Sequence, residues 1–209
     1  MITSKKDLKY YLEADRLALG KKTRKPRLLG DEVWRFQRTL RKLEYYMNCK
    51  KSLIYRPVVN FYKLKYYLWC VLLGYTISPN VFGPGLSIAH RGTLLVHRLS
   101  KVGANCRIHV CVNIGSSAGT SDDAPIIGNN VYIGPGVKMY GKIEIADDIV
   151  IGANAVVNQS FLEPGIAIGG VPAKKISDKG SGDYVIKATE ILDRMSQSVG
   201  ENSTPIERV

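Results

Sequence analysis

The sequence of 209 residues predicts a mainly β fold, a parallel β-helix, with a helical region before it. Three observations predict the β-helix: an aliphatic residue recurs at every sixth position, a second aliphatic row runs at offset four, and glycine often follows a residue of the first row. The first row is Ile127, Ile133, Met139, Ile145, Ile151 and Val157, with Val102, Ile108 and Ile114 upstream. The second row is Cys106, Val112, Val131, Val137, Ile143, Ile149 and Ala155.

A step of six favours a solenoid over an ordinary helix or sheet. Helical side chains repeat every ~3.6 residues and strand side chains every ~2, whereas about six residues per flat face fit a coil with three faces. Glycine turns the chain at the corners without the steric cost of a Cβ atom. A helical core is the alternative, but this density of glycine and β-branched residues opposes it.

Residues 1–75 form the first of three expected regions and are predicted to hold three helices. The first spans 5–19, the second is capped by Asp31 and runs to about 46, and the third begins near Pro57 and ends near 73. The basic run at 21–27 is expected to be an exposed linker. The region can also cover the first coil of the β-helix, whose strand groups would otherwise be unpaired.

Aromatic residues recur at helical spacing in the third predicted helix, at Tyr62, Tyr66, Trp69 and Leu73. The spacing predicts an apolar stripe that packs on the solenoid or on another subunit. The alternative is a basic, aromatic amphipathic helix that lies on a membrane. The most apolar run, 66–75, has about half of the ~20 residues that a membrane-spanning helix needs.

The positive charge is confined to the first third of the chain. Residues 1–75 carry 18 Lys and Arg against 6 Asp and Glu, whereas residues 76–209 carry 12 against 12. A solvated surface is the ordinary interpretation; an anionic partner, an acidic neighbouring subunit or peripheral contact with an anionic membrane are the functional ones. Nucleic acid is not expected as a partner, because no recognisable reading motif accompanies the charge.

The solenoid is predicted from near Ile77 to about Val171, within a domain at 76–176. Its step of six breaks between Leu94 and Val102, where eight residues separate the two, and this slip is placed just after His90.

A second break is larger, because thirteen residues separate Ile114 from Ile127 and leave the loop GSSAGTSDDAP. Loops that interrupt a rigid repeat often carry function, so both breaks are expected to mark the active site.

Residues 177–209 are predicted to be a polar tail with one short helix at about 184–195. The four cysteines form no CxxC pair and have no metal-ligand spacing with the three histidines, so no metal site is expected. A reduced, cytoplasmic protein fits this pattern, and the N-terminal residues lack the apolar stretch of a secretion signal. A cytoplasmic protein of this charge can also bind peripherally to the inner face of a membrane, which is the alternative location.

Two motifs flank the interrupted coils: FGPGLSIAHRGT at 82–93 and AIGGVPAKK at 167–175. Together they resemble the serine acetyltransferase family of hexapeptide-repeat acyltransferases over roughly residues 76–176. The resemblance implies a left-handed β-helix, homotrimers or assemblies of trimers, and acetyl-CoA bound as co-substrate between neighbouring solenoids. It also implies direct transfer of acetyl to a hydroxyl, with neither a covalent enzyme intermediate nor a metal.

His90 falls on the catalytic histidine of that family. A hydroxyl needs a base to remove its proton as it attacks, and an imidazole titrates near neutral pH. A backbone N–H from a glycine-rich turn can stabilise the resulting oxyanion. His109, in the sequence IHVCV, is expected to be a structural or supporting group rather than the base, and His97 a surface residue.

Two supporting groups of the serine-specific enzymes are missing. Ala124 stands where those enzymes have a second histidine, and their carboxylate falls near Tyr75 or Thr76. Asp122 and Asp123 in the loop are the remaining carboxylates that can orient an acceptor or an imidazole, although loop carboxylates are more often solvated.

These losses favour the related branch of enzymes that acetylate sugars in capsule or exopolysaccharide synthesis over L-serine acetyltransferases. Transfer to the nitrogen of an amino sugar and a non-catalytic trimeric scaffold, whose basic region recruits a partner, are the other interpretations. The sequence alone does not choose the acceptor.

The resemblance also places the coenzyme. Small residues at the corners let the pantetheine arm lie close to the backbone, and two lysines can meet the coenzyme phosphates. The corresponding positions are Pro135, Ala153, Gly169, Gly170, Ala173, Lys174 and Lys175.

Overall fold

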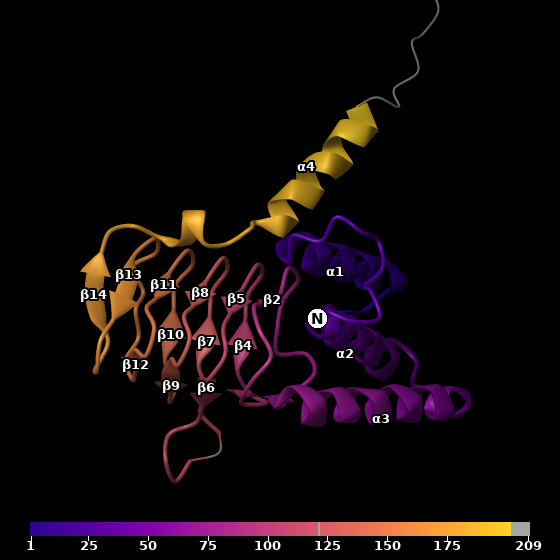
Figure 1. The fold of residues 1–209 in the computed structure, drawn as a ribbon, viewed down its shortest axis with the longest axis horizontal. Coiled ribbons are helices and arrows are strands. Elements are labelled where there is room, and N and C mark those ends of the chain that lie inside the picture. The colour runs from indigo at the N-terminus through magenta and orange to yellow at the C-terminus, as the bar shows by residue number, and fades with distance from the viewer. Residues whose placement is uncertain (121, 202–209) are drawn as a thin grey trace, which may run out of the picture.

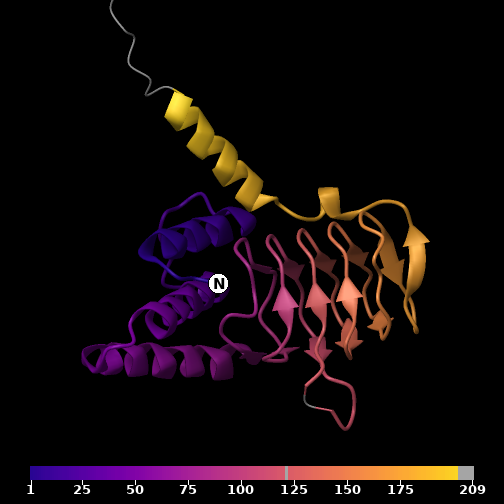
Figure 2. The ribbon, with the colours of Figure 1, turned by 180° about the vertical axis from the view of Figure 1, so that it is seen from behind.

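A computed structural model describes residues 1–120 and 122–201; the end of the predicted tail, 202–209, lies outside them. Three helices stand at one end of a solenoid of short strands, and a fourth helix projects beside them (Figure 1). The view from behind shows the strands stacked along one axis and a loop hanging from the solenoid (Figure 2).

The helices of the N-terminal region are α1 (Lys5–Ala18), α2 (Glu32–Cys49) and α3 (Arg56–Leu73), with a short 3₁₀ turn at Leu53–Tyr55. All three lie within a few residues of the predicted bounds. The Ser4 hydroxyl accepts a 3.0 Å hydrogen bond from the Asp7 N–H and caps α1. Gly74 ends α3 in the left-handed conformation, with a φ of +75°.

Asp31 precedes α2, but the prediction that its side chain caps the helix is wrong. The carboxylate instead accepts the Arg27 N–H at 2.8 Å and forms an ion pair with Lys21. These contacts direct the carboxylate towards the linker, and it accepts no hydrogen bond from the first turn of α2. They also fold the linker back, so that its first residue is anchored while most of 22–30 is exposed.

The solenoid has three faces, called A, B and C here. Face A contains β1 (Tyr75–Ile77), β3 (Leu94–Val96), β6 (Val112–Gly115), β9 (Lys138–Tyr140) and β12 (Val156–Val157). Face B contains β4 (Lys101–Val102), β7 (Ile126–Ile127) and β10 (Glu144–Ile145). Face C contains β2 (Ser87–Ile88), β5 (Arg107–Ile108), β8 (Tyr132–Ile133), β11 (Val150–Ile151), β13 (Ala167–Gly169) and β14 (Lys174–Ser177).

Strands pair in parallel between successive coils, except that β14 runs antiparallel to β13. On face C the register aligns Ile88, Ile108, Ile133, Ile151 and Ile168. Aliphatic residues of successive coils therefore stack directly on one another along the axis.

Both aliphatic rows predicted from the sequence lie in the core, and each of their residues is at most 6% exposed. Cys106 is among them, and burial raises the pKa of its thiol to about 12. The tight spacing of the coils explains Gly134, since a Cβ atom there would lie 2.8 Å from the Ile151 carbonyl oxygen.

The corner between faces B and C uses asparagine and aspartate in place of glycine. Asn105, Asn130 and Asp148 have positive φ there, a conformation that these short polar residues tolerate. The Asn105 amide donates to Asn130 at 2.9 Å, and the Asn130 amide donates to Asp148 at 3.2 Å. This ladder joins successive coils at one corner.

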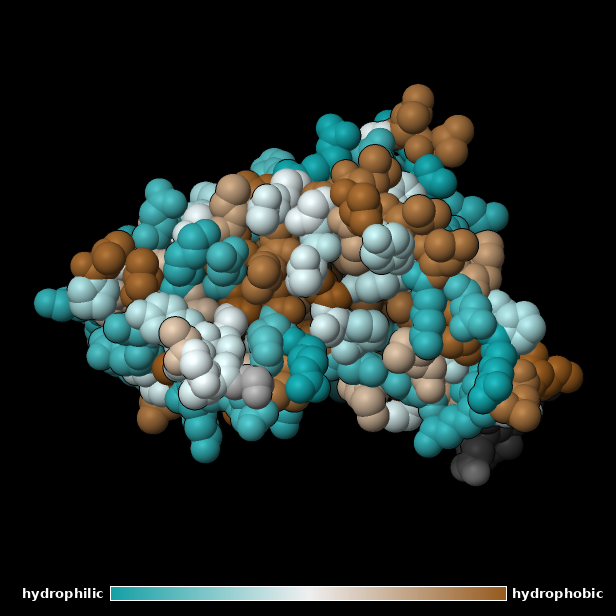
Figure 3. Space-filling view, turned by 90° about the horizontal axis from the view of Figure 1, so that it is seen from below, coloured by the Kyte–Doolittle hydropathy of each residue, from teal (hydrophilic) through white to brown (hydrophobic). Residues whose placement is uncertain are grey.

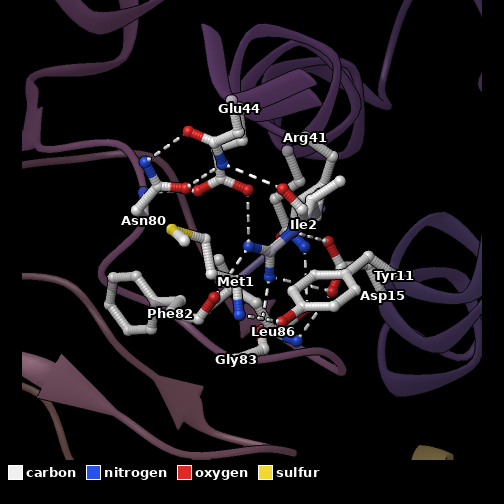
Figure 4. A network of polar contacts seen from close by, with 12 residues as sticks. Met1, Ile2, Tyr11, Asp15, Arg41, Glu44, Asn80, Phe82, Gly83 and Leu86 are labelled. Atoms are coloured by element: carbon white, nitrogen blue, oxygen red, sulfur yellow. Dashed lines mark hydrogen bonds and ion pairs between the residues drawn. The ribbon is translucent and has the colours of Figure 1, made fainter. Parts of the chain in front are cut away.

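The helices cover the first coil through a buried guanidinium (Figure 4). Arg41 is fully buried and donates to Asp15 at 2.9 Å, to Glu44 at 3.1 Å and to the Phe82 carbonyl at 2.9 Å. Burial opposes its charge, but Asp15 and Glu44 outweigh that effect, and the pKa of Arg41 is raised. The expectation that the helical region covers the first coil is therefore confirmed.

Two further side chains bind the backbone of that coil. Asp15 accepts the Gly85 and Leu86 N–H groups at 3.0 and 2.9 Å. The Gln37 amide donates to the Leu86 carbonyl at 2.7 Å and accepts the Ile88 N–H at 3.2 Å. Backbone groups that would pair with a preceding coil are thus satisfied by side chains of α1 and α2.

After β14 the chain runs back along the B–C corner, where the Ser181 N–H donates to the Asp148 carbonyl at 3.0 Å. The last helix, α4 (Ala188–Glu201), starts later than predicted and packs Ala188 against Ala14 and Ala18 of α1.

Candidate active site

His90 lies at the corner where the chain passes from face C to face A, between β2 and β3. The Tyr75 hydroxyl donates a 2.8 Å hydrogen bond to the His90 carbonyl, and the Gly92 N–H donates a 3.1 Å bond to the Leu73 carbonyl. The end of α3 and the start of β1 therefore hold the turn that carries this exposed histidine. Tyr75, near which the family carboxylate falls, thus contacts the main chain of His90.

The two-residue break in the repeat lies one corner further along than the sequence predicts. Residues 97–100 form a turn between β3 and β4, in which the Ser100 N–H donates to the His97 carbonyl at 3.1 Å. The loop at 115–125 leaves the same A–B corner, between β6 and β7. Because face A separates this corner from His90, one chain does not bring the two breaks and His90 together.

Three of the predicted coenzyme positions instead share the C–A corner with His90. The register of face C aligns Ile88, Ile108, Ile133, Ile151 and Ile168. The residues two positions later are therefore aligned at the corner. This corner column consists of His90, Val110, Pro135, Ala153 and Gly170. Pro135, Ala153 and Gly170 are exposed, so the small residues expected to bind the coenzyme lie along the same edge as the predicted base.

The remaining coenzyme positions differ in their exposure. Gly169 and Ala173 are buried, and Ala173 is 1% exposed, so neither presents surface to a ligand within one chain. Lys174 is exposed on β14, opposite Gly169. Lys175 forms 2.6 Å ion pairs with Glu163 and Asp178, and hydrogen bonds to these two carboxylates raise its pKa.

His109 lies beside the corner column on the next coil, and its ring centroid is 5.8 Å from that of His90. Its Nε2 atom is buried and has no hydrogen-bond partner within residues 1–120 and 122–201. Burial, then Arg107 and His90, lower the pKa of His109 from its ordinary value of 6.5. A neutral imidazole therefore stands next to the predicted base.

A cavity of about 320 Å³ opens beside His90 between the first two coils and the N-terminal region. Its wall carries charges of both signs: Arg91 and Arg107 come from the coils, Lys21 from the linker, and Asp31 and Glu32 from the start of α2. Sequence reasoning missed these residues. The many charged residues at 21–32 could have indicated a binding site. The start of this segment was interpreted only as an exposed linker.

Arg107 also borders a second cavity of about 490 Å³, which His109, Tyr132 and Tyr184 line. The rings of His109 and Tyr132 are 5.1 Å apart, and those of Tyr132 and Tyr184 are 5.2 Å apart. A row of rings thus leads away from His90 along the outside of face C, and Arg107 lies between the two cavities.

The loop aspartates lie away from His90 within one chain. Asp123 accepts the Ser117 N–H at 3.2 Å and also the Thr120 hydroxyl, and these bonds, Thr120 first, lower its pKa. Asp122 is exposed. Asp123 therefore stabilises the fold of its own loop.

In the part of the chain that the structure describes, no group of three or more His, Cys, Asp or Glu side chains is arranged to hold a metal ion.

Comparison with known proteins defines the class first. Residues 124–159 match the family described as bacterial transferase hexapeptide (six repeats). Solved structures that resemble this one include serine acetyltransferase of Neisseria gonorrhoeae, with a TM-score of 0.65, 25% identity, and coverage of 83% of this chain and 68% of that one. The complex of the Brucella abortus enzyme with coenzyme A has a TM-score of 0.66, 24% identity, and coverage of 84% and 70%. The predicted left-handed β-helix is confirmed.

Curated relatives narrow the class. Serine acetyltransferase of Mycobacterium tuberculosis is 34% identical over 108 residues, which cover 51% of this chain and 47% of that protein. The Helicobacter pylori enzyme is 34% identical over 108 residues, covering 51% and 63%. The chain therefore spans less than two thirds of the length of these relatives. The chain is thus similar to serine acetyltransferases, the resemblance that the motifs predicted, and it carries hexapeptide repeats over residues 124–159.

Proposed function

We propose that this protein is an acetyl-CoA-dependent O-acetyltransferase in which His90 is the general base. The observation that carries the proposal is the corner column, which aligns His90 with the exposed small residues Pro135, Ala153 and Gly170. The similarity to serine acetyltransferases, one of them solved with coenzyme A, supports the same reaction.

In the proposed reaction the His90 imidazole takes the proton of an acceptor hydroxyl as that oxygen attacks the thioester carbonyl of acetyl-CoA. The C–S bond of the tetrahedral intermediate then breaks, the acetyl ester is formed, and the coenzyme leaves as a thiol with the proton that His90 returns. The hydrogen bond from Tyr75 and the bond between Gly92 and Leu73 fix the turn, so the base is positioned before the acceptor binds.

His109 is proposed to support His90 as a neutral neighbour. Its lowered pKa keeps it uncharged, so it does not repel the imidazolium that forms on His90 during the reaction. Its unpartnered Nε2 atom can exchange a hydrogen bond with the acceptor or with a bound water molecule.

The coenzyme is proposed to lie along the corner column, where small side chains admit the pantetheine arm. Lys174, exposed at the end of the column, is the lysine that can meet a phosphate, because Lys175 is held by two carboxylates. Gly169 and Ala173 lie beneath this edge and shape it from below, since both are buried.

The proposed acceptor is a sugar hydroxyl of surface polysaccharide synthesis, because Ala124 replaces the second histidine that the serine-specific enzymes place there. L-serine is the second candidate, and one observation favours it. The cavity beside His90 carries both cations and carboxylates, which can pair with the carboxylate and the ammonium of an amino acid.

We propose that the active form is a homotrimer or an assembly of trimers, in which the loop of one subunit meets the His90 corner of the next. Such an assembly is the arrangement in which Asp122 and Asp123 can reach the site, because a single chain keeps the two corners apart. Leu95 and Tyr140 on face A and Ile126 on face B are about 40% exposed and offer apolar surface for it. The basic N-terminal region is proposed to add peripheral contact with an anionic membrane.

The decisive experiment measures release of coenzyme A thiol from acetyl-CoA with L-serine, free sugars, amino sugars, and lipid-linked or polymeric saccharides as acceptors. Release with a saccharide hydroxyl is the expected result. Release with L-serine alone would overturn the preferred acceptor and leave the reaction class intact. No release with any acceptor would overturn the enzyme and favour a non-catalytic scaffold.

A further inference from the structure

Helix α3 exposes an apolar face that the fold does not cover. Its inward side packs Tyr66, Trp69 and Leu73 against the core, as the sequence predicted. Its outward side carries a second stripe at helical spacing, whose residues are each 58–70% exposed. This outward stripe consists of Phe61, Leu64, Leu68, Val71 and Leu72. Leu53 and Ile54, 67% and 78% exposed, extend it beyond the start of the helix.

The surroundings of the stripe are positively charged. No Asp or Glu occurs between Glu44 and Asp122, whereas Lys50, Lys51, Arg56, Lys63 and Lys65 precede or lie within α3. Figure 3, which views the molecule from below, shows brown apolar side chains interleaved with teal hydrophilic ones over the part where α3 lies. An apolar stripe with flanking cations and no acid is typical of a helix that lies in a bilayer interface.

The geometry sets how such a helix meets a membrane. α3 has 18 residues, and no helix within residues 1–120 and 122–201 is long and apolar enough to cross a membrane. Its inward side is also needed by the core, where Leu73 is 3% exposed. The helix can therefore only lie parallel to the surface, with the outward stripe inserted and the basic residues at the level of the headgroups.

A second copy of the chain fits this face less well. Pairing two α3 helices would cover the apolar stripes, but it would bring together five cations from each copy without a carboxylate from the same stretch. Like charges in an interface are unfavourable, whereas anionic headgroups complement them. We propose that the outward face of α3 is a docking surface for an anionic lipid bilayer.

The docked helix would also position the active site, a point that depends on the proposed function. The last residue of α3, Leu73, accepts the Gly92 N–H, and Tyr75 binds the His90 carbonyl two residues after the helix ends. The turn that carries His90 is therefore joined directly to the end of the docked helix. An acceptor saccharide attached to a lipid is then held on the same surface as the enzyme.

Co-sedimentation of the full-length protein with vesicles tests the docking surface. The vesicles contain phosphatidylcholine alone or phosphatidylcholine with phosphatidylglycerol. We expect binding to the anionic vesicles only, weakened by salt. Leu64→Ser/Leu68→Ser and Lys63→Glu/Lys65→Glu should each reduce this binding about tenfold or more, because each Lys near the surface contributes about fivefold and the stripe supplies the apolar insertion.

Matched controls separate this face from general charge and apolarity. Lys5→Glu/Lys6→Glu makes the same charge change on exposed residues of α1, and Leu162→Ser removes an exposed leucine from the solenoid. Both should bind the vesicles like the unchanged protein. Every substituted side chain is exposed, so circular dichroism and thermal unfolding should show the same folded state.

Three results would overturn the proposal. One is no binding to anionic vesicles; another is binding that survives both α3 double substitutions or is lost equally in the α1 control. The third is a larger assembly, without lipid binding, that the α3 substitutions dissociate, since a second copy would then cover the face. Transfer of acetyl to a free acceptor should be unchanged in the α3 variants, so failure of docking is distinguishable from failure of the enzyme.

Discussion

The regular coils from Ile126 to Val157 and the first coil, which the helices cover, are stabilised differently. The regular coils stack aliphatic side chains and rely on few polar groups in their interior. The first coil has no preceding coil, and Arg41, Asp15 and Gln37 bind its backbone from α1 and α2. The same helices complete the cavity beside His90. The end of the repeat, where other elements must satisfy the backbone, is thus where a distinct site is built.

The largest expected effect comes from His90→Ala at the covered end. Loss of a general base should lower kcat about 10²–10⁴-fold while binding of acetyl-CoA is kept. His97→Ala, in the turn at 97–100, is the matched control and should remain active. Steady-state kinetics and calorimetric binding of the coenzyme check both. Near-normal turnover of the His90 variant would show that His90 is not the general base.

Arg41→Met should lower the free energy of unfolding by about 3–5 kcal/mol, because it leaves Asp15 and Glu44 buried without their cation. Lys187→Met breaks a partly exposed pair with Asp148 and should cost at most about 1 kcal/mol. Denaturant unfolding measures both. An equal loss in the free energy of unfolding for the two variants would show that the buried guanidinium is not needed to bind the helices to the first coil.

In the regular coils, Ile133→Ala should cost about 2–5 kcal/mol, since it leaves a cavity where Ile133 is fully buried. Ile126→Ala, at a site 44% exposed, should cost much less. Ile133→Ala should leave the KM for acetyl-CoA unchanged under conditions where the protein is folded, which would separate the stability of the coils from the binding of the coenzyme. A coupled loss of coenzyme affinity would mean that core packing also shapes the corner column.

Lys174→Glu should raise the KM for acetyl-CoA up to about fivefold, because exposed ion pairs contribute at most about 1 kcal/mol. Lys175→Glu should have a smaller effect, since Lys175 is already paired with Glu163 and Asp178. Initial rates at varied acetyl-CoA concentration distinguish the two. A larger effect at Lys175 would reverse the assignment of the phosphate contact.

The smallest expected effect is on the pH dependence of stability. The pKa of His109 is lowered below its ordinary value of 6.5, chiefly by burial, so the unfolded chain binds more protons just below that pH. The stability that neutral His109 allows is present above pH 6.5 and falls as the pH is lowered towards the folded pKa. His109→Gln should flatten the fall, as thermal unfolding between neutral and mildly acidic pH would reveal. An unchanged slope would contradict the assignment.

The fold was predictable where periodicity expresses burial directly, as in the rows that contain Ile133 and Val137. Contacts between distant segments were not, because no local pattern tells which backbone group Arg41 or Asp15 will bind. Counting the step of six located the first break between Leu94 and Val102, but the corner depended on which residues form the turn. The outward stripe of α3 was not predicted, because the aromatic residues of the inward side already accounted for the helical spacing.

For the candidate site, the motif identified His90 and the step of six indicated corner positions such as Pro135. The charged wall from Lys21 to Glu32 was not predictable, since it depends on how the linker folds back on Asp31. The loop aspartates Asp122 and Asp123 are a third case, because in the proposed assembly they reach the site only from a neighbouring subunit.

The buried guanidinium also constrains the order of folding. Arg41 contacts Asp15, which is 26 residues away, and the Phe82 carbonyl, which is 41 residues away. During synthesis α1 and α2 can therefore form before the first coil exists, but the charge of Arg41 stays solvated until residues 82–86 arrive. We therefore expect docking of the helices to follow the formation of that coil, because contacts distant in sequence form slowly.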